Sequence, residues 1–163
     1  MIGKNAGIVG YGKIGSKIAK YLKALGCNVF INDIKKSKKK LKNYLTFNSL
    51  LLKCNYIFFA VNLNQTSKKM LTFKHKRYLK KKPAIINIAR GPVLDEKFVI
   101  YCLKNKLIKN AGLDVFEKEP INKTNKLLSF KNNFYSAHNA FNTMESVEKT
   151  NSRVIENLIN GLK

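Results

Sequence analysis

The stretch Ala6-Gly7-Ile8-Val9-Gly10-Tyr11-Gly12-Lys13-Ile14-Gly15 decides the fold of this chain. Its first five residues predict a buried strand. After the glycines, Ile14, Ile18 and Leu22 recur at the spacing of one helix face. A G-x-G-x-x-G turn that joins a strand to a helix is the fingerprint of a dinucleotide-binding βαβ unit. The sequence therefore predicts a dinucleotide site near its own N-terminus.

Each glycine of this turn has an expected task. Gly10 makes the tight turn, Gly12 lets the backbone approach a pyrophosphate, and Gly15 lets the helix pack closely on the strand. The backbone N–H groups of Lys13 and Ile14 should then point at the phosphates, where the helix dipole favours negative charge. These five residues are predicted cofactor contacts.

Asp33 supplies the acid that the fingerprint requires at the end of the second strand. It follows Gly15 by 18 residues and should accept hydrogen bonds from both adenosine ribose hydroxyls. A carboxylate there repels a 2′-phosphate, so the sequence favours NAD over NADP. Lys35 and Lys36 weaken this preference, because cations nearby could pair with the extra phosphate.

Short apolar runs alternate with helical patterns along the whole chain, which predicts an α/β fold. We expect a Rossmann doubly wound parallel sheet, covered on both faces, in a single domain over residues 1–163. Ligands of such sheets bind beyond the carboxyl ends of the strands. The predicted strands are 6–10, 28–32, 56–61, 84–89, 111–115 and 133–137, and the predicted helices are 14–25, 49–53, 66–80 (one or two), 95–104 and 143–162.

Chemically active side chains follow the last three predicted strands. Asn87-Ile88-Ala89-Arg90-Gly91 ends the fourth, Leu113-Asp114-Val115-Phe116-Glu117-Lys118-Glu119-Pro120 ends the fifth, and Ser136-Ala137-His138-Asn139 ends the sixth. In a parallel sheet these ends meet at one edge. An arginine, two acids and a histidine should therefore converge there.

At these motifs the sequence resembles the D-isomer-specific 2-hydroxyacid dehydrogenases, a family that includes phosphoglycerate dehydrogenase and D-lactate dehydrogenase. The likeness runs from Gly3 to about Thr150 and rests on N-x-A-R-G-x-x-x-D at 87–95, L-D-V-F-E-x-E-P at 113–120 and the following histidine. The resemblance implies an NAD-dependent oxidoreductase that acts on the CH–OH group of a D-2-hydroxy acid.

The resemblance also implies roles for single residues. Arg90 would hold the carboxylate and carbonyl of the substrate, His138 would be the general acid/base, and Glu119 would pair with His138 and orient it. Asp114 would lie near the carboxamide of the nicotinamide. The other expected cofactor contacts at these strand ends are Val61, Ile88, Ala89, Asn139, Ala140 and Phe141.

Two departures from the family pattern bear on function. First, the chain has Ala137-His138-Asn139-Ala140-Phe141 where Pro-His-Ile-Gly-Gly is usual, and this difference removes no catalytic group. Second, the family's substrate-binding domain is missing from this sequence, so the chain is expected to be a truncated or fragment form. The alternative is a non-catalytic NAD-binding or NAD-sensing module, or a subunit that needs a separate substrate domain. Retention of Arg90, Glu119 and His138 favours the enzyme.

The formal net charge is +23, from 32 Lys and Arg against 9 Asp and Glu. Such an excess is typical of partners of nucleic acids or anionic membranes. Arginine occurs only at Arg77, Arg90 and Arg153, whereas nucleic-acid readers favour arginine forks. Lys, Asn and Ile all suit an A/T-rich genome. Composition alone therefore favours drift of a solvated surface and makes a nucleic-acid partner unlikely.

Further expectations concern the setting of the chain. No apolar run is long enough to span a bilayer, so we expect no membrane partner. Cys27, Cys54 and Cys102 lie in apolar runs and predict buried thiols in a reducing cytoplasm, not a metal site or disulfides. His75 is interpreted as structural. The resemblance implies a homodimer formed through this domain.

Overall fold

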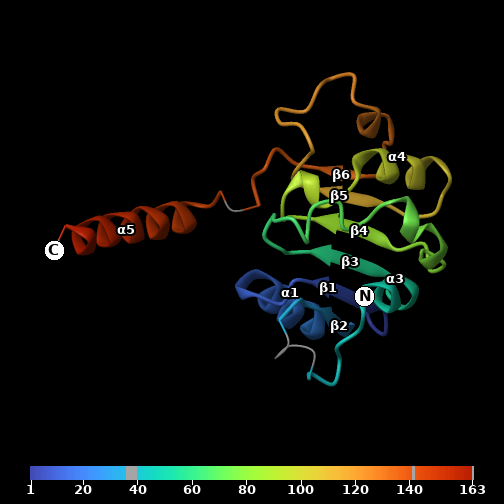
Figure 1. Ribbon diagram of the computed structural model, residues 1–163, viewed down its shortest axis with the longest axis horizontal. Helices are drawn as coiled ribbons and strands as arrows, with labels where there is room; N and C mark the ends of the chain where they lie inside the picture. The colour runs from blue at the N-terminus through green and yellow to red at the C-terminus, as the bar shows by residue number, and fades with distance from the viewer. Residues whose placement is uncertain (36–39, 141, 163) are drawn as a thin grey trace.

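The computed structural model describes residues 1–35, 40–140 and 142–162, and within these ranges six parallel strands form one sheet (Figure 1). The strand order is β2-β1-β3-β4-β5-β6: the chain adds β2 on one side of β1, then returns to add β3 to β6 on the other side. This confirms the predicted doubly wound Rossmann fold. The strands are β1 (Asn5–Val9), β2 (Asn28–Asn32), β3 (Tyr56–Phe59), β4 (Ala84–Asn87), β5 (Ala111–Leu113) and β6 (Phe134–Tyr135).

Three of the four α-helices in the described ranges begin at a capping side chain, whereas the first begins at the glycine turn without one. Asp95 caps α4 by accepting a hydrogen bond from Phe98 N–H at 3.2 Å, and Thr143 caps α5 by accepting one from Ser146 N–H. The first helix ends before Gly26, which has a φ of 79°. The α-helices are α1 (Lys13–Ala24), α3 (Phe47–Lys53), α4 (Glu96–Lys104) and α5 (Met144–Gly161); the 3₁₀ helices are η1 (Phe73–Tyr78), η2 (Gly91–Val93) and η3 (Lys126–Ser129).

Adjacent residues of β1 show that helices lie on both faces of the sheet. A Cβ added to Gly7 would meet the side chain of Leu50 in α3, whereas Ile8 lies against Gly15 in α1. Because successive strand residues point to opposite faces, α1 and α3 cover opposite sides of the sheet. The larger core cluster, on the α3 side, also contains Phe98 and Val99 of α4.

Coverage of the α1 face is incomplete, which corrects the expectation of a sheet covered on both faces. One row of residues crosses this face in register: Ile8, Phe58, Ile86, Gly112 and Phe134. Ile8 is fully buried under α1, but Phe58, Ile86 and Gly112 are partly exposed and Phe134 is 72% exposed. Among the described helices, α1 packs on β1 and β2 and leaves this face of β4–β6 partly exposed.

The prediction of one or two helices over 66–80 is wrong in extent and type. The segment contains turns, a left-handed residue at Lys69 (φ 51°) and an extended residue at Leu71, which pairs with Leu94. Regular helix forms only in η1, where Thr72 and His75 make a reciprocal capping box. His75 is buried there, which confirms its structural interpretation. The predicted strands 56–61, 84–89, 111–115 and 133–137 end earlier than expected.

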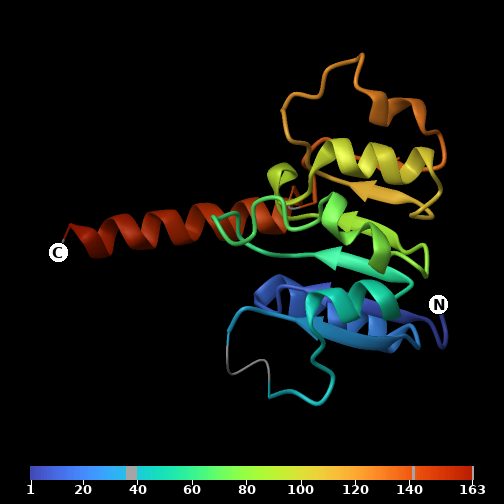
Figure 2. The ribbon, with the colours of Figure 1, turned by 45° about the vertical axis from the view of Figure 1, so that its right-hand side comes forward.

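The last helix stands apart from the body. α5 projects from the edge where the strands end, in both views (Figures 1 and 2), and none of its residues is buried. Its exposed apolar side chains are Met144, Val147, Val154, Ile155, Leu158 and Ile159. No helix in the described part of the chain is both long and apolar enough to cross a membrane.

The three cysteines are buried and unpaired, as expected. Burial raises the pKa of Cys54 and of Cys102 to about 12, although nearby lysines oppose the shift. Their thiols are therefore unreactive packing groups.

Candidate active site

The glycine turn has the predicted geometry. Gly10 has a φ of 92°, and a Cβ on Gly15 would lie 1.9 Å from the Gly10 carbonyl oxygen, so α1 approaches β1 as closely as predicted. A Cβ on Gly12 would meet nothing within 4 Å. Open space therefore lies directly in front of the N-terminus of α1, where the first N–H groups of a helix have no partner within the helix.

A groove of about 470 Å³ runs along this edge of the sheet. Of the predicted cofactor residues, Gly10, Gly12, Asp33 and Val61 line it. The groove has both the open turn and the acid that a dinucleotide requires. The residues present therefore fit NAD.

Asp33 follows β2 and faces the glycine turn. Its Oδ2 accepts a hydrogen bond from Tyr11 N–H at 2.7 Å, and its Oδ1 accepts one from Lys35 N–H at 2.8 Å. These bonds fix the carboxylate at the groove. Each oxygen keeps a second lone pair for a ribose hydroxyl.

The opposite wall of the groove was missed in the sequence. It comes from the segment after β3, where Ser67 Oγ donates to the Asn62 carbonyl at 2.6 Å and Asn64 Oδ1 accepts from Thr66 and Ser67 N–H. Tyr44 and Met70 complete the lining. The only available signal was position, because the segment follows a strand at the carboxyl edge.

Arg90 is presented by a short turn after β4. Asn87, buried at the end of that strand, donates from Nδ2 to the Arg90 carbonyl and accepts from Ala89 N–H, both at 3.0 Å. The Arg90 side chain is exposed at the edge of the sheet, and one guanidinium nitrogen donates to the Ala89 carbonyl at 2.7 Å. Next to it, a Cβ on Gly91 would lie 1.8 Å from the Phe116 carbonyl oxygen. This close approach brings the turns after β4 and β5 together.

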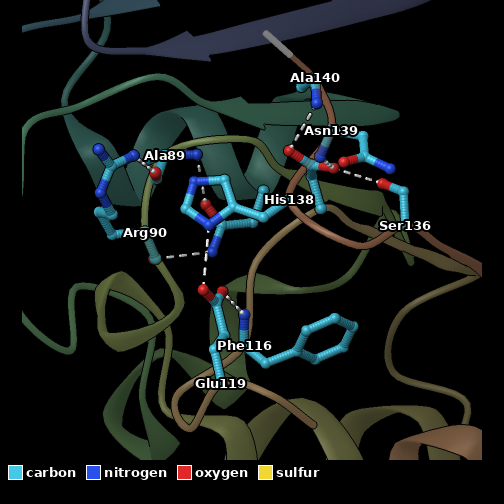
Figure 3. A network of polar contacts seen from close by, with 10 residues as sticks. Ala89, Arg90, Phe116, Glu119, Ser136, His138, Asn139 and Ala140 are labelled. Atoms are coloured by element: carbon cyan, nitrogen blue, oxygen red, sulfur yellow. Dashed lines mark hydrogen bonds and ion pairs between the residues drawn. The ribbon is translucent and has the colours of Figure 1, made fainter. Parts of the chain in front are cut away.

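The side chains of His138 and Glu119 form a hydrogen-bonded pair across two strand ends (Figure 3). The His138 Nδ1 lies 3.0 Å from Glu119 Oε2, and both side chains are about one third exposed, at 35% and 38%. Burial raises the pKa of Glu119, but the hydrogen bond from Phe116 N–H, the bond and charge of His138 and the charge of Arg90 outweigh it. The pKa of Glu119 therefore lies below its usual 4.5. The carboxylate is held ionised beside the imidazole.

Asp114 organises the turn that carries His138. Its carboxylate accepts hydrogen bonds from Ser136 Oγ (2.5 Å), Asn139 N–H (2.8 Å) and Ala140 N–H (3.1 Å). Its carbonyl accepts from His138 N–H, and His138 itself adopts a left-handed backbone with a φ of 58°. The same carboxylate therefore fixes both sides of a backbone conformation that is uncommon for a non-glycine residue.

We expect the substitution Asp114→Asn to change how stability depends on pH. Burial raises the pKa of Asp114, but the bonds from Ser136, Ala140 and Asn139 outweigh it and lower the pKa below 3.8. A carboxyl with a lower pKa in the folded state stabilises the fold above its unfolded pKa, about 3.9, and this stabilisation is lost as pH falls through the folded pKa.

Urea unfolding between about pH 7 and pH 3 tests this expectation. Asp114→Asn should be less stable than the parent at neutral pH, and the difference should shrink towards acid pH. Glu156→Gln, on the exposed helix α5, is the control and should keep the parent's pH dependence. A constant gap between Asp114→Asn and the parent at every pH would contradict the assignment.

The structure thus brings Arg90, Glu119, His138 and Asp114 to one edge, together with Ala89, Asn139 and Ala140. Ile88 lies in the same turn as Ala89 and is partly exposed. Lys13 and Ile14 occupy the first turn of α1 with exposed side chains, and Gly15 is buried behind them. Phe141 lies outside the described residues. In the described part of the chain, no group of three or more His, Cys, Asp or Glu side chains could hold a metal ion.

Comparison with known proteins identifies the family. A family model described as "D-isomer specific 2-hydroxyacid dehydrogenase, NAD binding domain" matches residues 1–140. The chain belongs to this family. Membership confirms the resemblance drawn from the motifs and agrees with the predicted cofactor, NAD.

Individual relatives give the same picture. The chain is 32% identical over 161 residues to a glyoxylate reductase of Korarchaeum cryptofilum, which covers 96% of this chain and 48% of the relative. It is 29% identical to a chloroplastic D-3-phosphoglycerate dehydrogenase of Arabidopsis thaliana, covering 28% of that protein. The structure of a glyoxylate reductase from Paecilomyes thermophila superposes with a TM-score of 0.91 at 27% identity, over 99% of this chain and 50% of that one. The chain thus spans about half the length of the two glyoxylate reductases and 28% of the phosphoglycerate dehydrogenase.

Proposed function

We propose that this chain is the NAD-binding half of an oxidoreductase that interconverts a D-2-hydroxy acid and a 2-keto acid. The observation that carries the proposal is the His138–Glu119 pair, at 3.0 Å, at the same strand edge as Arg90 and the dinucleotide groove. A groove for NAD alone would need none of these three side chains. Family membership supports the same reaction class.

NAD would lie along the carboxyl edge of the sheet. Its pyrophosphate would be held by the turn of Gly10, Gly12 and Gly15 and by the N–H groups of Lys13 and Ile14, and its adenosine ribose by Asp33. The nicotinamide end would reach the turns after β4, β5 and β6, with Val61, Ile88, Ala89, Asp114, Asn139, Ala140 and Phe141 as the proposed contacts. When bound, the cofactor would accept a hydride from carbon 2 of the substrate during oxidation or give one to carbon 2 during reduction.

The chain's own residues would orient the substrate and move its proton. Arg90 offers a planar pair of N–H donors that matches the carboxylate and carbonyl oxygens of a 2-keto acid. The His138 Nδ1–H donates to Glu119, which makes Nε2 the basic nitrogen of the neutral ring. His138 would take the hydroxyl proton during oxidation and return it during reduction, while Glu119 stabilises the charged imidazolium.

We propose that a substrate-binding half completes the site. Arg90, Glu119 and His138 all lie exposed or partly exposed at one edge of a single domain, so water reaches them from that side. A second wall would exclude that water and supply the contacts that select a substrate. That wall would come from a longer protein or from a separate chain.

Gly12→Glu tests the cofactor site. The new carboxylate would occupy the open space before α1 and repel a pyrophosphate, so NADH affinity should fall at least about 100-fold. The fold should hold, because a Cβ at Gly12 meets nothing within 4 Å. The measurement is titration of NADH fluorescence, which suffers no indole transfer because the chain has no tryptophan.

Gly161→Glu is the matched control, since a Cβ at Gly161, in α5, also meets nothing within 4 Å. It should bind NADH like the parent. If Gly12→Glu retains the parent's NADH affinity, the groove is not the cofactor site.

We further propose that the protein acts in the cytoplasm as a homodimer. Two surfaces support self-association: the partly exposed row Phe58, Ile86 and Phe134, and the apolar side of α5. The net charge of +23 opposes association at low salt. Light scattering should therefore show a dimer when salt screens that charge, and a monomer at high salt would contradict the proposal.

The second candidate is a non-catalytic NAD-binding or NAD-sensing module, which would need only the glycine turn and Asp33 of the groove. It predicts NADH binding without turnover. Rates of NADH oxidation with a panel of 2-keto acids, with and without a separately supplied substrate-binding half, separate the two candidates.

A further inference from the structure

The positive charge of this chain is unevenly distributed. Residues 34–94 contain 16 of the 32 lysines and arginines and none of the nine acids. Drift in composition alone would spread both kinds of residue along the chain. The 61-residue stretch without a carboxylate therefore calls for a structural explanation.

Part of this charge surrounds a hollow at the edge opposite the dinucleotide groove. The hollow measures about 620 Å³, and no carboxylate lines it. Apart from Leu103 in α4, its residues lie in the segments that precede β4, β5 and β6, at the amino ends of these parallel strands. The lining contains five lysines, Lys81, Lys82, Lys106, Lys109 and Lys131, together with Leu103, Ile108, Phe130, Asn132 and Asn133.

Two of these lysines occupy backbone positions that suit another residue better. Lys82 and Lys106 have φ values of 47° and 53°, a left-handed conformation that asparagine adopts more readily. Asparagine is abundant in this chain and is favoured by the same compositional drift. Lysine therefore stands at both positions against the preference of the backbone.

Aromatic rings accompany the cations on the adjoining surface of η1 and α4. Phe73 is half exposed and packs on Tyr101, at 5.1 Å between ring centroids. Lys76 Nζ lies 2.6 Å from the Tyr101 hydroxyl and 5.1 Å from its ring centroid. Arg77 lies over the Tyr78 ring at 4.9 Å. Rings interleaved with cations are typical of surfaces on which bases stack while lysines track phosphates.

We propose that this amino-edge face binds single-stranded nucleic acid. The five lysines of the hollow would contact successive phosphates, and the Phe130 ring in the hollow would take a base. Lys76 and Arg77 of η1 add two cations to the five lysines of the hollow, which is more charge than one small anion would neutralise. The scarcity of arginine fits backbone tracking better than reading of a duplex groove. The face is separate from the dinucleotide groove, so the two ligands would not compete.

The test is anisotropy of a labelled single-stranded RNA of about 20 nucleotides, titrated with the full chain at several salt concentrations around 150 mM. The parent should bind with micromolar affinity. The triple variant Lys81→Gln, Lys109→Gln, Lys131→Gln should bind at least about tenfold more weakly. The slope of log affinity against log salt should become shallower by about 2, or about 0.7 for each lost phosphate contact.

The matched control is Lys17→Gln, Lys20→Gln, Lys23→Gln on the exposed face of α1, which removes the same charge elsewhere. It should change affinity less than about twofold. Phe130→Leu should weaken single-strand binding about fivefold or more without changing the salt slope. Urea unfolding checks that each variant is folded.

Four results would overturn the proposal: no binding near 150 mM salt, equal losses in the two triple variants, a duplex of the same sequence bound as tightly as the single strand, or tripolyphosphate displacing the RNA at equal phosphate concentration. The first two would mean that the charge belongs to a solvated surface without a nucleic-acid partner. The third would remove the single-strand assignment, and the fourth would make the hollow a site for a small polyanion.

Discussion

His138→Gln should lower the rate of NADH oxidation with a 2-keto acid by about 10²- to 10⁴-fold, the usual contribution of a positioned general acid. Glutamine keeps the size and polarity of the side chain but cannot carry a proton between pH 5 and 9. His138 also lies on the turn that Asp114 holds through Asn139 and Ala140 N–H, so that turn should persist in the variant. NADH affinity should therefore stay within about twofold of the parent.

A companion variant separates proton transfer from orientation. Glu119→Gln removes the charge facing His138 at 3.0 Å but leaves an oxygen that can accept from Phe116 N–H. Its rate should fall less than that of His138→Gln, and the pH dependence of the rate should shift. If His138→Gln oxidises NADH as fast as the parent, His138 is not the acid/base.

Arg90→Lys should lower kcat/KM for a 2-keto acid by about 10- to 150-fold, although it preserves the charge. A guanidinium donates two parallel hydrogen bonds to a carboxylate, whereas an ammonium acts as a point charge. The loss of one charge-assisted bond and of its geometry is worth about 1.5–3 kcal/mol. The turn should survive, because Asn87 bonds to the backbone of residues 89 and 90 and not to the side chain.

Arg153→Lys, on the polar side of α5, is the matched control and should leave kcat/KM unchanged. A truncated test substrate, an aldehyde without the carboxylate, adds a second check. The rate with the aldehyde should fall less in Arg90→Lys than the rate with the 2-keto acid does, because only the hydrogen bond to the carbonyl remains to be lost. Equal losses with both substrates would mean that Arg90 supports the fold and does not hold the carboxylate.

Much of the fold and of the candidate site can be predicted from the sequence. The spacing of Gly10, Gly12, Gly15 and Asp33 encodes a local βαβ unit, and local units follow from periodicity and turn chemistry. Arg90, Glu119 and His138 lie three to six residues beyond the ends of β4, β5 and β6, and their roles were inferred from the resemblance to the dehydrogenase family. In a parallel sheet that position alone brings residues together from distant parts of the chain.

What the sequence did not reveal depends on tertiary contacts. The helix predicted over 66–80 was lost to a pairing between Leu71 and Leu94, which periodicity within the segment cannot report. Likewise, the bonds from Asp114 to Ser136, Asn139 and Ala140 join turns that are 22 to 26 residues apart. The partly exposed face of the sheet beyond Phe58 could not be predicted either, because it depends on how far α1 extends over the sheet and not on the sequence of any single strand.

Transfer of a hydride between NADH and carbon 2 of an acid at this edge of the sheet can be measured by isotope transfer. The full chain is mixed with NADH deuterated on its reactive carbon and a 2-keto acid, with and without a separately supplied substrate-binding half, and the product is analysed by mass and chirality. The expected product is a D-2-hydroxy acid carrying one deuterium at carbon 2, and His138→Gln should strongly reduce its yield. Absence of deuterated product even with the added half would contradict the claim and leave the chain a module that only binds NAD.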